Sequence, residues 1–326
     1  MRPIKWGIVG PGKIAHHFAN DLKLVKDAEL SAVASRNKQR ALDFAKEHNV
    51  PNAFEGYETL FQIDLVDILY VATPHVFHKN LTIRAMQYGK HILCEKPLGI
   101  NLKEVDEMIK MARENKVFLM EALWSRFNPT IRRVKELVEE GRLGVLKYIN
   151  ADFAFYALDR SSDSRLLNPA LAGGTLLDIG IYPVFLAYHF LGKPHEIKAV
   201  SNFNEMGTEI QTSIIFQYSD AQAVLNSSFT HHSRMSAEIA GSKGRVTLQP
   251  RFHETQGFEM TIEGVSESIG LSTTGRGYYH EIVEVNQCIR DGKMESELWS
   301  HTDSQELIAL LDEIRRISGI TFPFEI

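Results

Sequence analysis

Strand-like and helix-like segments alternate along the first 120 residues, and this alternation restricts the fold more than any other feature of the sequence. Short apolar runs are each followed by a more polar segment that favours a helix. The run at residues 66–72, Val-Asp-Ile-Leu-Tyr-Val-Ala, is typical of a buried parallel strand. We therefore predict a parallel sheet with helices on its faces. The predicted strands are residues 4–9, 30–35, 66–72, 91–94 and 117–120, and the predicted helices are residues 14–24, 38–48, 76–88 and 102–115.

After Glu121 the pattern changes to strands in which apolar and polar residues alternate. Residues 209–217 are an example, and such alternation suits an antiparallel sheet with one covered face. We place the domain boundary near residue 122, which gives domains of residues 1–122 and 123–326. Strands are predicted at 146–155, 197–203, 209–217, 221–229, 236–240, 244–248 and 258–262, and helices at 128–140, 176–191, 278–291 and 302–318.

Composition and charge exclude several classes of protein. A chain of 326 residues is long enough for two domains. Its formal net charge of -5 provides no general basic field, so no nucleic-acid partner is expected. The first ten residues do not resemble a signal peptide, and the longest apolar run, 179–191, is too short to span a bilayer. Two distant cysteines, Cys94 and Cys288, fit a reducing compartment, and we predict a cytoplasmic protein without a membrane partner.

A glycine-rich turn follows the first predicted strand. Its sequence is Gly10-Pro-Gly-Lys13-Ile14-Ala15, and it opens a predicted helix. Gly10 permits a tight turn, Gly12 lets the backbone approach a pyrophosphate, and the small Ala15 allows the helix to pack on the strand. The helix N-terminus offers N–H groups to anionic oxygens. The motif predicts a dinucleotide site, although a plain turn between strand and helix would have the same sequence.

The end of the second strand indicates which dinucleotide is bound. Enzymes that use NAD tend to carry an acidic residue there, which binds the ribose hydroxyls. This chain has Ser35 and Arg36 instead, with Arg40 one turn later, and no carboxylate precedes Asp43. A guanidinium pairs with the 2′-phosphate of NADP, so we predict NADP(H) and regard NAD(H) as the weaker candidate. The alternative is that both arginines belong to a solvated helix start.

Two further strands end in polar residues. Thr73, Pro74 and His75 follow residues 66–72 and are expected at the carboxyl edge of the sheet, where ligands of such folds bind. His75 and His78 are three residues apart, but neither a cysteine nor a nearby carboxylate completes a metal site, so no metal is predicted. Lys96 follows Glu95 at the end of the next strand, and its ammonium could polarise a carbinol or carbonyl oxygen. A solvated loop lysine is the alternative.

A third group of polar residues lies in the second half of the chain. The segment Gly173-Gly-Thr-Leu-Leu-Asp178-Ile-Gly-Ile-Tyr182-Pro183 opens an apolar helix. Asp178 and Tyr182 are four apart and are expected on one helix face. Burying them is costly unless they are paired, which predicts a shared polar site. Hydrogen bonds to the backbone of the second domain would also explain them.

These motifs together resemble the Gfo/Idh/MocA oxidoreductases along essentially the whole chain. The likeness is carried by GPGKIA, VATPHVFH at 71–78, CEKPLG at 94–99 and GGTLLDIGIYP at 173–183. Within the family the chain looks most like the branch of dimeric dihydrodiol dehydrogenases and NADP-dependent D-xylose dehydrogenases. The narrower likeness rests on ASRN at 34–37, MEALWSRFNP at 120–129 and the tyrosine of the last motif.

The resemblance implies a fold and a set of roles. The fold would be α/β, with an N-terminal Rossmann dinucleotide-binding domain and a C-terminal α/β domain whose large, mostly antiparallel sheet forms a homodimer interface. Lys96 would be catalytic, with Glu95 near the nicotinamide, and His75, Trp124 and Phe153 would line the substrate pocket. Many members carry Asp and His four apart where this chain has Asp178 and Tyr182, which favours Tyr182 as acid/base.

We therefore predict an NADP(H)-dependent oxidoreductase. It would transfer a hydride between nicotinamide C4 and a carbinol or carbonyl carbon of a sugar, cyclic diol or related small polyol. Tyr182 would accept the hydroxyl proton, Lys96 would lower its pKa, and Asp178 would orient Lys96 or a substrate hydroxyl. The alternatives are an NAD-dependent sugar or inositol dehydrogenase and a non-catalytic NADP-binding sensor of the same fold.

Overall fold

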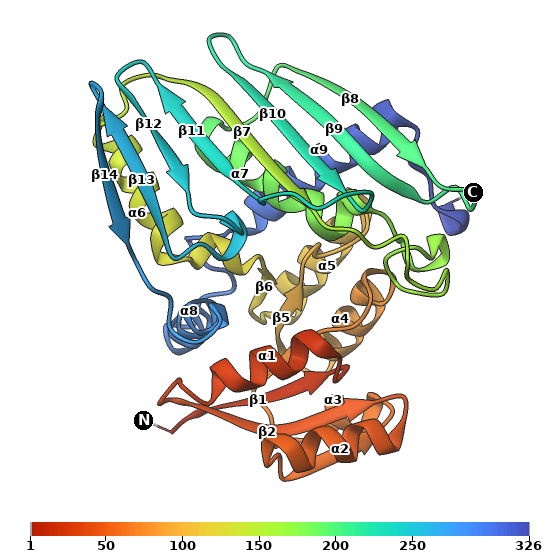
Figure 1. The fold of residues 1–326 in the computed structure, drawn as a ribbon. Coiled ribbons are helices and arrows are strands. Elements are labelled where there is room, and N and C mark those ends of the chain that lie inside the picture. The colour runs from red at the N-terminus through yellow and green to blue at the C-terminus, as the bar shows by residue number, and fades with distance from the viewer. Residues whose placement is uncertain (1, 326) are drawn as a thin grey trace. The chain divides into compact units, whose positions relative to one another are not determined.

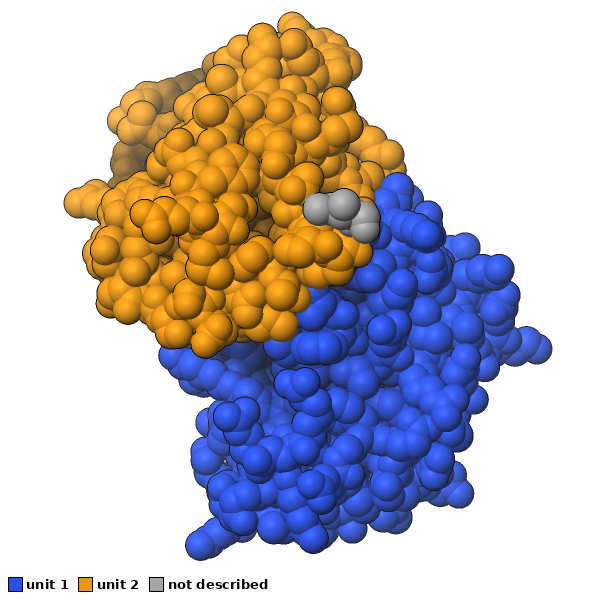
Figure 2. Space-filling model, turned by 90° about the vertical axis from the view of Figure 1, so that its right-hand side faces the viewer, with its two compact units in different colours: residues 1–127, 274–305 blue, residues 128–273, 306–326 orange. Residues whose placement is uncertain are grey.

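The computed structural model describes residues 2–325 and divides the chain into two compact units. Unit 1 consists of residues 1–127 and 274–305, and unit 2 of residues 128–273 and 306–326 (Figure 2). Each unit is built around one sheet, and the two sheets share no strand.

Unit 1 contains a six-stranded parallel sheet in the order β3-β2-β1-β4-β5-β6. This is the Rossmann order, and it confirms the predicted fold of this half. Every residue of β4 is buried, as expected for a central strand between two helical layers. The elements are β1 Ile4–Val9, α1 Lys13–Leu22, β2 Ala28–Ser35, α2 Lys38–His48, β3 Asn52–Glu55, α3 Glu58–Gln62, β4 Ile68–Val71, α4 His78–Gln87, β5 His91–Glu95, α5 Leu102–Asn115, β6 Leu119–Ala122 and, from the later segment, α8 Tyr278–Arg290.

The later segment joins unit 1 through a buried carboxylate at the end of α1. Asp21 accepts backbone N–H groups from Arg276, Gly277 and Tyr279 at 2.9, 3.0 and 3.2 Å, which caps the start of α8. Helix α8 therefore belongs to compact unit 1, although residues 128–273 lie between its segment and the first part of that unit along the chain. The boundary at residue 122 stays a prediction about domains, whereas the compact unit runs on to Phe127 and includes α8.

Unit 2 contains an eight-stranded sheet in the order β14-β13-β12-β11-β7-β10-β9-β8. All neighbouring strands are antiparallel except β7 and β10, which confirms the mostly antiparallel sheet. Helices α6 Pro129–Glu139, α7 Ile181–Leu191 and most of α9 His301–Ser318 lie on one face of the sheet (Figure 1). The strands are β7 Leu146–Ala154, β8 Glu196–Phe203, β9 Glu209–Gln217, β10 Gln222–Ser228, β11 Ala237–Gly241, β12 Gly244–Leu248, β13 Gly257–Ile262 and β14 Val265–Gly270.

The apolar helix of unit 2 forms its core. The stretch Pro169–Leu191 is long and apolar enough to cross a membrane, but 89% of its most apolar window is buried inside the protein. A π-helical turn, Leu176–Gly180, precedes α7 and carries Asp178, so a single regular α-helix over 176–191 does not form. The buried Glu209 carboxylate accepts the N–H groups of Thr175 and Leu176 at 2.6 and 3.0 Å, which caps this turn.

Candidate functional site

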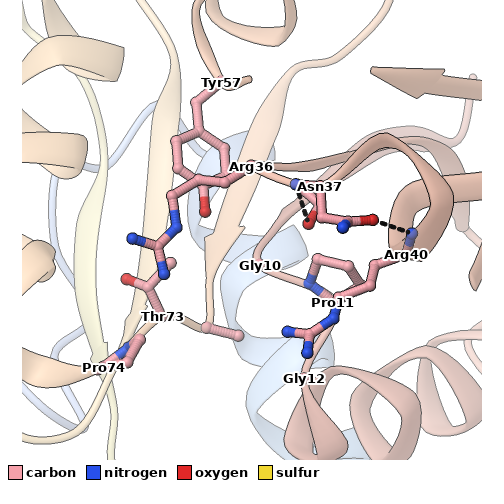
Figure 3. A pocket seen from close by; sticks show the side chains of 11 residues that line it. Gly10, Pro11, Gly12, Arg36, Asn37, Arg40, Tyr57, Thr73 and Pro74 are labelled. Atoms are coloured by element: carbon pink, nitrogen blue, oxygen red, sulfur yellow. Dashed lines mark hydrogen bonds between the residues drawn. The ribbon is translucent and has the colours of Figure 1, made fainter. Parts of the chain in front are cut away.

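A pocket of about 350 Å³ lies in unit 1 at the carboxyl ends of β1, β2 and β4 (Figure 3). The sheet order reverses between β1 and β4, and dinucleotides bind at this place in Rossmann folds. The pocket contains seven residues that the sequence singled out. Its lining is Gly10, Pro11, Gly12, Ser35, Arg36, Asn37, Arg40, Tyr57, Ala72, Thr73 and Pro74.

The glycine-rich loop has the geometry that an anion requires. Gly10 has a φ of +91°, and a Cβ there would lie 2.9 Å from Thr73 Cγ2, so a larger residue would be strained and would clash. A Cβ on Gly12 would have no neighbour within 4 Å, which leaves space for a ligand close to the backbone. Lys13 and Ile14 are exposed in the first turn of α1, whereas Ala15 is fully buried against the sheet.

Two aromatic residues surround Arg36. Its guanidinium carbon lies 5.2 Å from the ring centroid of Phe77. Tyr57 lies beside Arg36 in the pocket, as Figure 3 shows. Burial raises the pKa of Tyr57, while the charge of Arg36 and its hydrogen bonding to the phenol oppose that shift. Tyr57 and Phe77 were not predicted to contact Arg36, because only the fold brings them to the end of β2.

Ser35 and Arg40 are ordered by the start of α2. The hydroxyl of Ser35 accepts the N–H of Asn37 at 3.2 Å, and the Asn37 side chain accepts the N–H of Arg40 at 3.0 Å (Figure 3). Asn37 is therefore the N-cap of α2, and Arg40 projects from the first turn. Arg36 and Arg40 are both exposed, and both line the pocket.

A hydrogen bond from the neighbouring strand β4 holds the Glu95–Lys96 segment at the end of β5. The buried Tyr70 hydroxyl of β4 donates to the Glu95 carboxylate, and the Tyr70 ring stacks on Phe18 with centroids 3.7 Å apart. Burial, with the nearby Glu95 charge, raises the pKa of Tyr70 well above its ordinary value, so this phenol remains a donor. Lys96 is half-buried, and its peptide bond to Pro97 is cis.

A buried histidine ties two strand ends together. His78 places Nε2 2.8 Å from the Thr73 carbonyl oxygen and Nδ1 2.9 Å from the Pro97 carbonyl oxygen. Burial lowers the pKa of His78, although both carbonyl groups act in the opposite direction. Because the neutral imidazole has one N–H, His78 donates to one of these carbonyl oxygens, and its ring lies between the loops of Thr73 and Pro97.

Glu121, at the end of β6, supports the same loop. Its carboxylate accepts from the Leu98 N–H at 2.9 Å, from Trp299 Nε1 at 3.1 Å and from the Ser304 hydroxyl at 2.9 Å. Burial raises the pKa of Glu121, and these hydrogen bonds oppose the shift. Nothing in the sequence indicated that Glu121 holds the loop after β5, because Leu98, Trp299 and Ser304 lie far from Glu121 along the chain.

The predicted pocket-lining aromatics lie in both units. In unit 1, Trp124 stacks on Tyr278 of α8 with centroids 4.7 Å apart. In unit 2, Phe153 lies 5.6 Å from the Tyr182 ring and 4.3 Å from the His253 ring, and Tyr182 and His253 are 5.2 Å apart, all between centroids. Tyr278 and His253 were missed because their segments follow the matched motifs by many residues.

Asp178 pairs with a residue that the sequence did not point to. Arg165 Nη1 lies 2.8 Å from Asp178 Oδ1, and the Asp178 side chain is 9% exposed whereas the Arg165 side chain is 47% exposed. The expected shared polar site around Asp178 therefore includes an arginine. Asp178 lies in the π-helical turn and Tyr182 in α7. The two residues are therefore not on one face of a single regular α-helix, as their spacing of four had predicted.

The predicted residues thus fall into two groups. Unit 1 holds the glycine-rich loop, Ser35, Arg36, Arg40, Thr73, Pro74, His75, Glu95, Lys96 and Trp124, and unit 2 holds Phe153, Asp178 and Tyr182. His75 is buried and its ring lies 5.9 Å from that of His78. Because Lys96 and Tyr182 belong to different units, their meeting at one substrate oxygen stays a prediction.

Comparison with known proteins identifies relatives of the whole chain. Trans-1,2-dihydrobenzene-1,2-diol dehydrogenase of the mouse, Mus musculus, is 35% identical over 333 residues, which cover 98% of this chain and 98% of that protein. A 3-ketoreductase from Actinomadura kijaniata, solved with NADP and TDP-benzene, is 27% identical with a TM-score of 0.88, covering 97% of this chain and 98% of that one. An aldose-aldose oxidoreductase from Caulobacter crescentus, 24% identical, shares the fold with a TM-score of 0.89 and covers 98% of each chain.

Two family profiles match the halves of the chain. Residues 4–123 match the Gfo/Idh/MocA oxidoreductase family with its NAD-binding Rossmann fold, and residues 131–247 match the C-terminal domain of the same family. Both the fold class and the resemblance are confirmed. With glycine-rich loop, Rossmann sheet order, second sheet and full-length relatives in agreement, this chain belongs to the Gfo/Idh/MocA oxidoreductase family.

Proposed function

We propose that this protein is an NADP(H)-dependent oxidoreductase that acts on a carbinol or carbonyl carbon of a sugar, cyclic diol or related small polyol. The observation that carries the cofactor choice is Arg36, which lines the pocket at the end of β2 where no carboxylate is present. The relatives support the reaction class, since they are named a dihydrodiol dehydrogenase and a ketoreductase that was solved with NADP.

The pocket fits the phosphorylated half of this dinucleotide. Gly12 leaves room for a pyrophosphate beside the N-terminus of α1, where backbone N–H groups attract anions. Arg36 and Arg40 offer two guanidinium groups to a 2′-phosphate, and the Ser35 hydroxyl has a proton to donate. When bound, the nicotinamide supplies the hydride acceptor or donor of the reaction.

The proton would be handled by residues of the chain. Tyr182 would accept the hydroxyl proton of the substrate during oxidation and return it during reduction. A free phenol has a pKa of about 10, and the Lys96 ammonium would stabilise the phenolate if the two groups share a substrate oxygen. Asp178, held by Arg165, would orient a substrate hydroxyl beside Tyr182, and His75, Trp124 and Phe153 would surround the carbon skeleton.

A spectrophotometric screen tests this function. Purified protein is mixed with NADP⁺ and a panel of pentoses, hexoses and cyclic diols, and NADPH formation is followed by its absorbance. We expect turnover with at least one substrate and a higher kcat/KM with NADP⁺ than with NAD⁺. Binding of NADPH without turnover in either direction over the panel would favour the sensor alternative.

We further propose that the protein is a cytoplasmic homodimer that forms through the helix-free face of the eight-stranded sheet. In β9, Thr212, Ile214 and Phe216 are buried, whereas Ser213 and Ile215 point to the other face and are exposed. Val200 of the neighbouring β8 is 68% exposed and Ile215 is 41% exposed. A second copy would cover these apolar side chains, and no nucleic acid or membrane is expected as a partner.

A further inference from the structure

Three side chains that can bind metal ions converge where α1 and the end of α2 meet in unit 1. His16 Nδ1 lies 2.9 Å from His48 Nε2 and 3.1 Å from Glu47 Oε1. The third separation, from His48 Nε2 to Glu47 Oε1, is 3.3 Å. None of the three residues lines the dinucleotide pocket, so the proposed function does not account for the cluster.

These separations match the coordination sphere of a transition metal. Zinc binds imidazole nitrogen and carboxylate oxygen at about 2.0–2.2 Å. Two donors at such distances from one ion lie about 2.9 Å apart at a right angle and about 3.4 Å apart at the tetrahedral angle. The three observed separations fall within this interval, so one ion would engage all three atoms with small shifts.

Packing holds the two imidazoles in this arrangement. The Phe44 ring lies between the helices, with its centroid 4.4 Å from that of His48 and 4.7 Å from that of His16. The His48 side chain is 1% exposed, whereas those of His16 and Glu47 are 33% and 59% exposed. An ion would therefore rest on a fixed buried ligand and remain open to water on its other side.

Hydrogen bonding without a metal is the competing explanation. Lys23 Nζ lies 3.3 Å from His48 Nδ1, and if its ammonium donates to Nδ1, then Nε2–H donates to His16 Nδ1. A metal on Nε2 displaces that proton to Nδ1 or to solvent. Lys23 is exposed and can turn away, so it competes with the ion without blocking it.

We propose that His16, Glu47 and His48 form a binding site for a divalent transition-metal ion that joins α1 to α2. Two imidazoles and one carboxylate select ions such as Zn²⁺, Ni²⁺ or Cu²⁺ over Mg²⁺ and Ca²⁺, which prefer oxygen ligands. The backbone N–H of His16 donates to the Gly12 carbonyl oxygen at 3.3 Å. An ion bound to His16 would therefore also stiffen the first turn of the dinucleotide-binding helix.

Calorimetric titration of the purified full chain with ZnCl₂ tests the proposal. We expect one equivalent of Zn²⁺ to bind saturably and to raise Tm, with MgCl₂ producing neither effect. His16→Gln, at a half-exposed position, should weaken binding more than about tenfold, since even an outer partner of a metal ligand contributes that much. Lys23→Met should tighten binding severalfold, because it removes the competing cation.

Matched variants separate this site from others. His17→Gln alters the histidine next to His16 in α1 and should leave the Zn²⁺ affinity unchanged. The same is expected when the consecutive exposed residues His231 and His232 of unit 2 are both changed to Gln. The proposal is overturned if wild-type protein shows no saturable binding below about 100 μM, a Kd equivalent to about 5.5 kcal/mol. It is also overturned if His16→Gln and His17→Gln bind Zn²⁺ equally.

Discussion

Arg36 is oriented by protein contacts at the mouth of the pocket. Its guanidinium rests over the Phe77 ring and hydrogen-bonds with Tyr57. A long cationic side chain normally loses rotamer entropy when it binds a phosphate. These aromatic neighbours limit that freedom in advance, so more of the interaction remains available for discrimination between NADPH and NADH.

Replacing Arg36 with Ala should remove the preference for NADPH. A charge-assisted pair contributes about 1.5–3 kcal/mol, so the NADPH affinity should fall about 10- to 150-fold while the NADH affinity changes little. Isothermal titration with both nucleotides measures this. Lys38→Ala, at the exposed first position of α2, is the control, and equal losses for NADPH and NADH in Arg36→Ala would contradict the assignment.

The Tyr182 hydroxyl can be tested by a change that keeps the ring. Tyr182→Phe should preserve the contacts with Phe153 and His253 but remove the group that exchanges the proton. We expect kcat to fall about 10²- to 10⁴-fold with nearly unchanged NADPH affinity. Tyr188→Phe on the same helix, which removes a hydrogen bond to Glu306, should retain kcat. If both variants were equally active, the acid/base role would belong to another residue.

Glu281 is a buried carboxyl group without a hydrogen-bond partner among the described residues. Burial first, and then the charges of Glu95 and Asp21, raise its pKa well above the ordinary value. The unfolded chain therefore releases this proton at lower pH than the folded chain, so the free energy of unfolding decreases as the pH rises above about 4.3.

Glu281→Gln should therefore be more stable than wild type near pH 8, and the advantage should shrink towards pH 4.5. The difference changes by at most about 1.4 kcal/mol per pH unit for one carboxyl group. Urea unfolding at several pH values measures it. Glu259→Gln, at an exposed position of β13, provides the control. A stability difference that is constant over this pH range would show that Glu281 is ionised in the folded protein.

At the scale of elements, side chains connect the carboxyl ends of β4, β5 and β6 along one edge of the sheet. His78 connects the loop after β4 with the loop after β5, and Glu121 of β6 holds Leu98 in the latter. These three connections fix the backbone on either side of Lys96. Lys96 lies in a loop, but these contacts hold its backbone in a fixed position relative to the sheet.

His78→Ala should therefore affect catalysis although His78 is not proposed to touch the substrate. It leaves one backbone carbonyl without its hydrogen-bond donor, at a cost of about 1–3 kcal/mol, and removes the ring that lies between the two loops, so Tm should fall. We expect kcat and the NADPH affinity to decrease together, measured by steady-state kinetics and titration. Lys79→Ala, which removes ion pairs to Glu104 and Glu107, is the neighbouring control and should change both little. Loss of stability with unchanged kcat would assign His78 a purely structural role.

At the scale of the whole molecule, we expect the eight-stranded sheet to form the proposed dimer interface. Its helix-covered face is the core of unit 2, and its other face carries Val200 and Ile215 among polar residues. The change Val200→Asp together with Ile215→Asp should convert a dimer at micromolar concentration into a monomer, because it places charges within the apolar contact. Light scattering reports the mass. Val283→Asp on α8 is the control for an added surface charge, and a monomeric wild-type protein would refute the dimer.

Local sequence information was sufficient for the Rossmann sheet and for one side of the pocket. The strand-helix alternation and the turn of Gly10 and Gly12 specify βαβ units, and parallel strands bring their carboxyl ends to one edge. Arg36 could therefore be placed in the pocket from its position after β2 alone. The short β3 and α3 were not predicted, because four or five residues carry too little periodicity.

The remaining features depend on contacts between residues far apart in the chain. Tyr57 and Phe77 reach Arg36, Glu121 reaches Leu98, and Arg165 reaches Asp178 only after the sheets and helices have packed. Except for β3, α3 and β14, the sequence by itself determined which segments form strands or helices, since this follows from spacing over a few residues. The tertiary structure decided which side chains face one another, because packing joins segments whose spacing carries no signal.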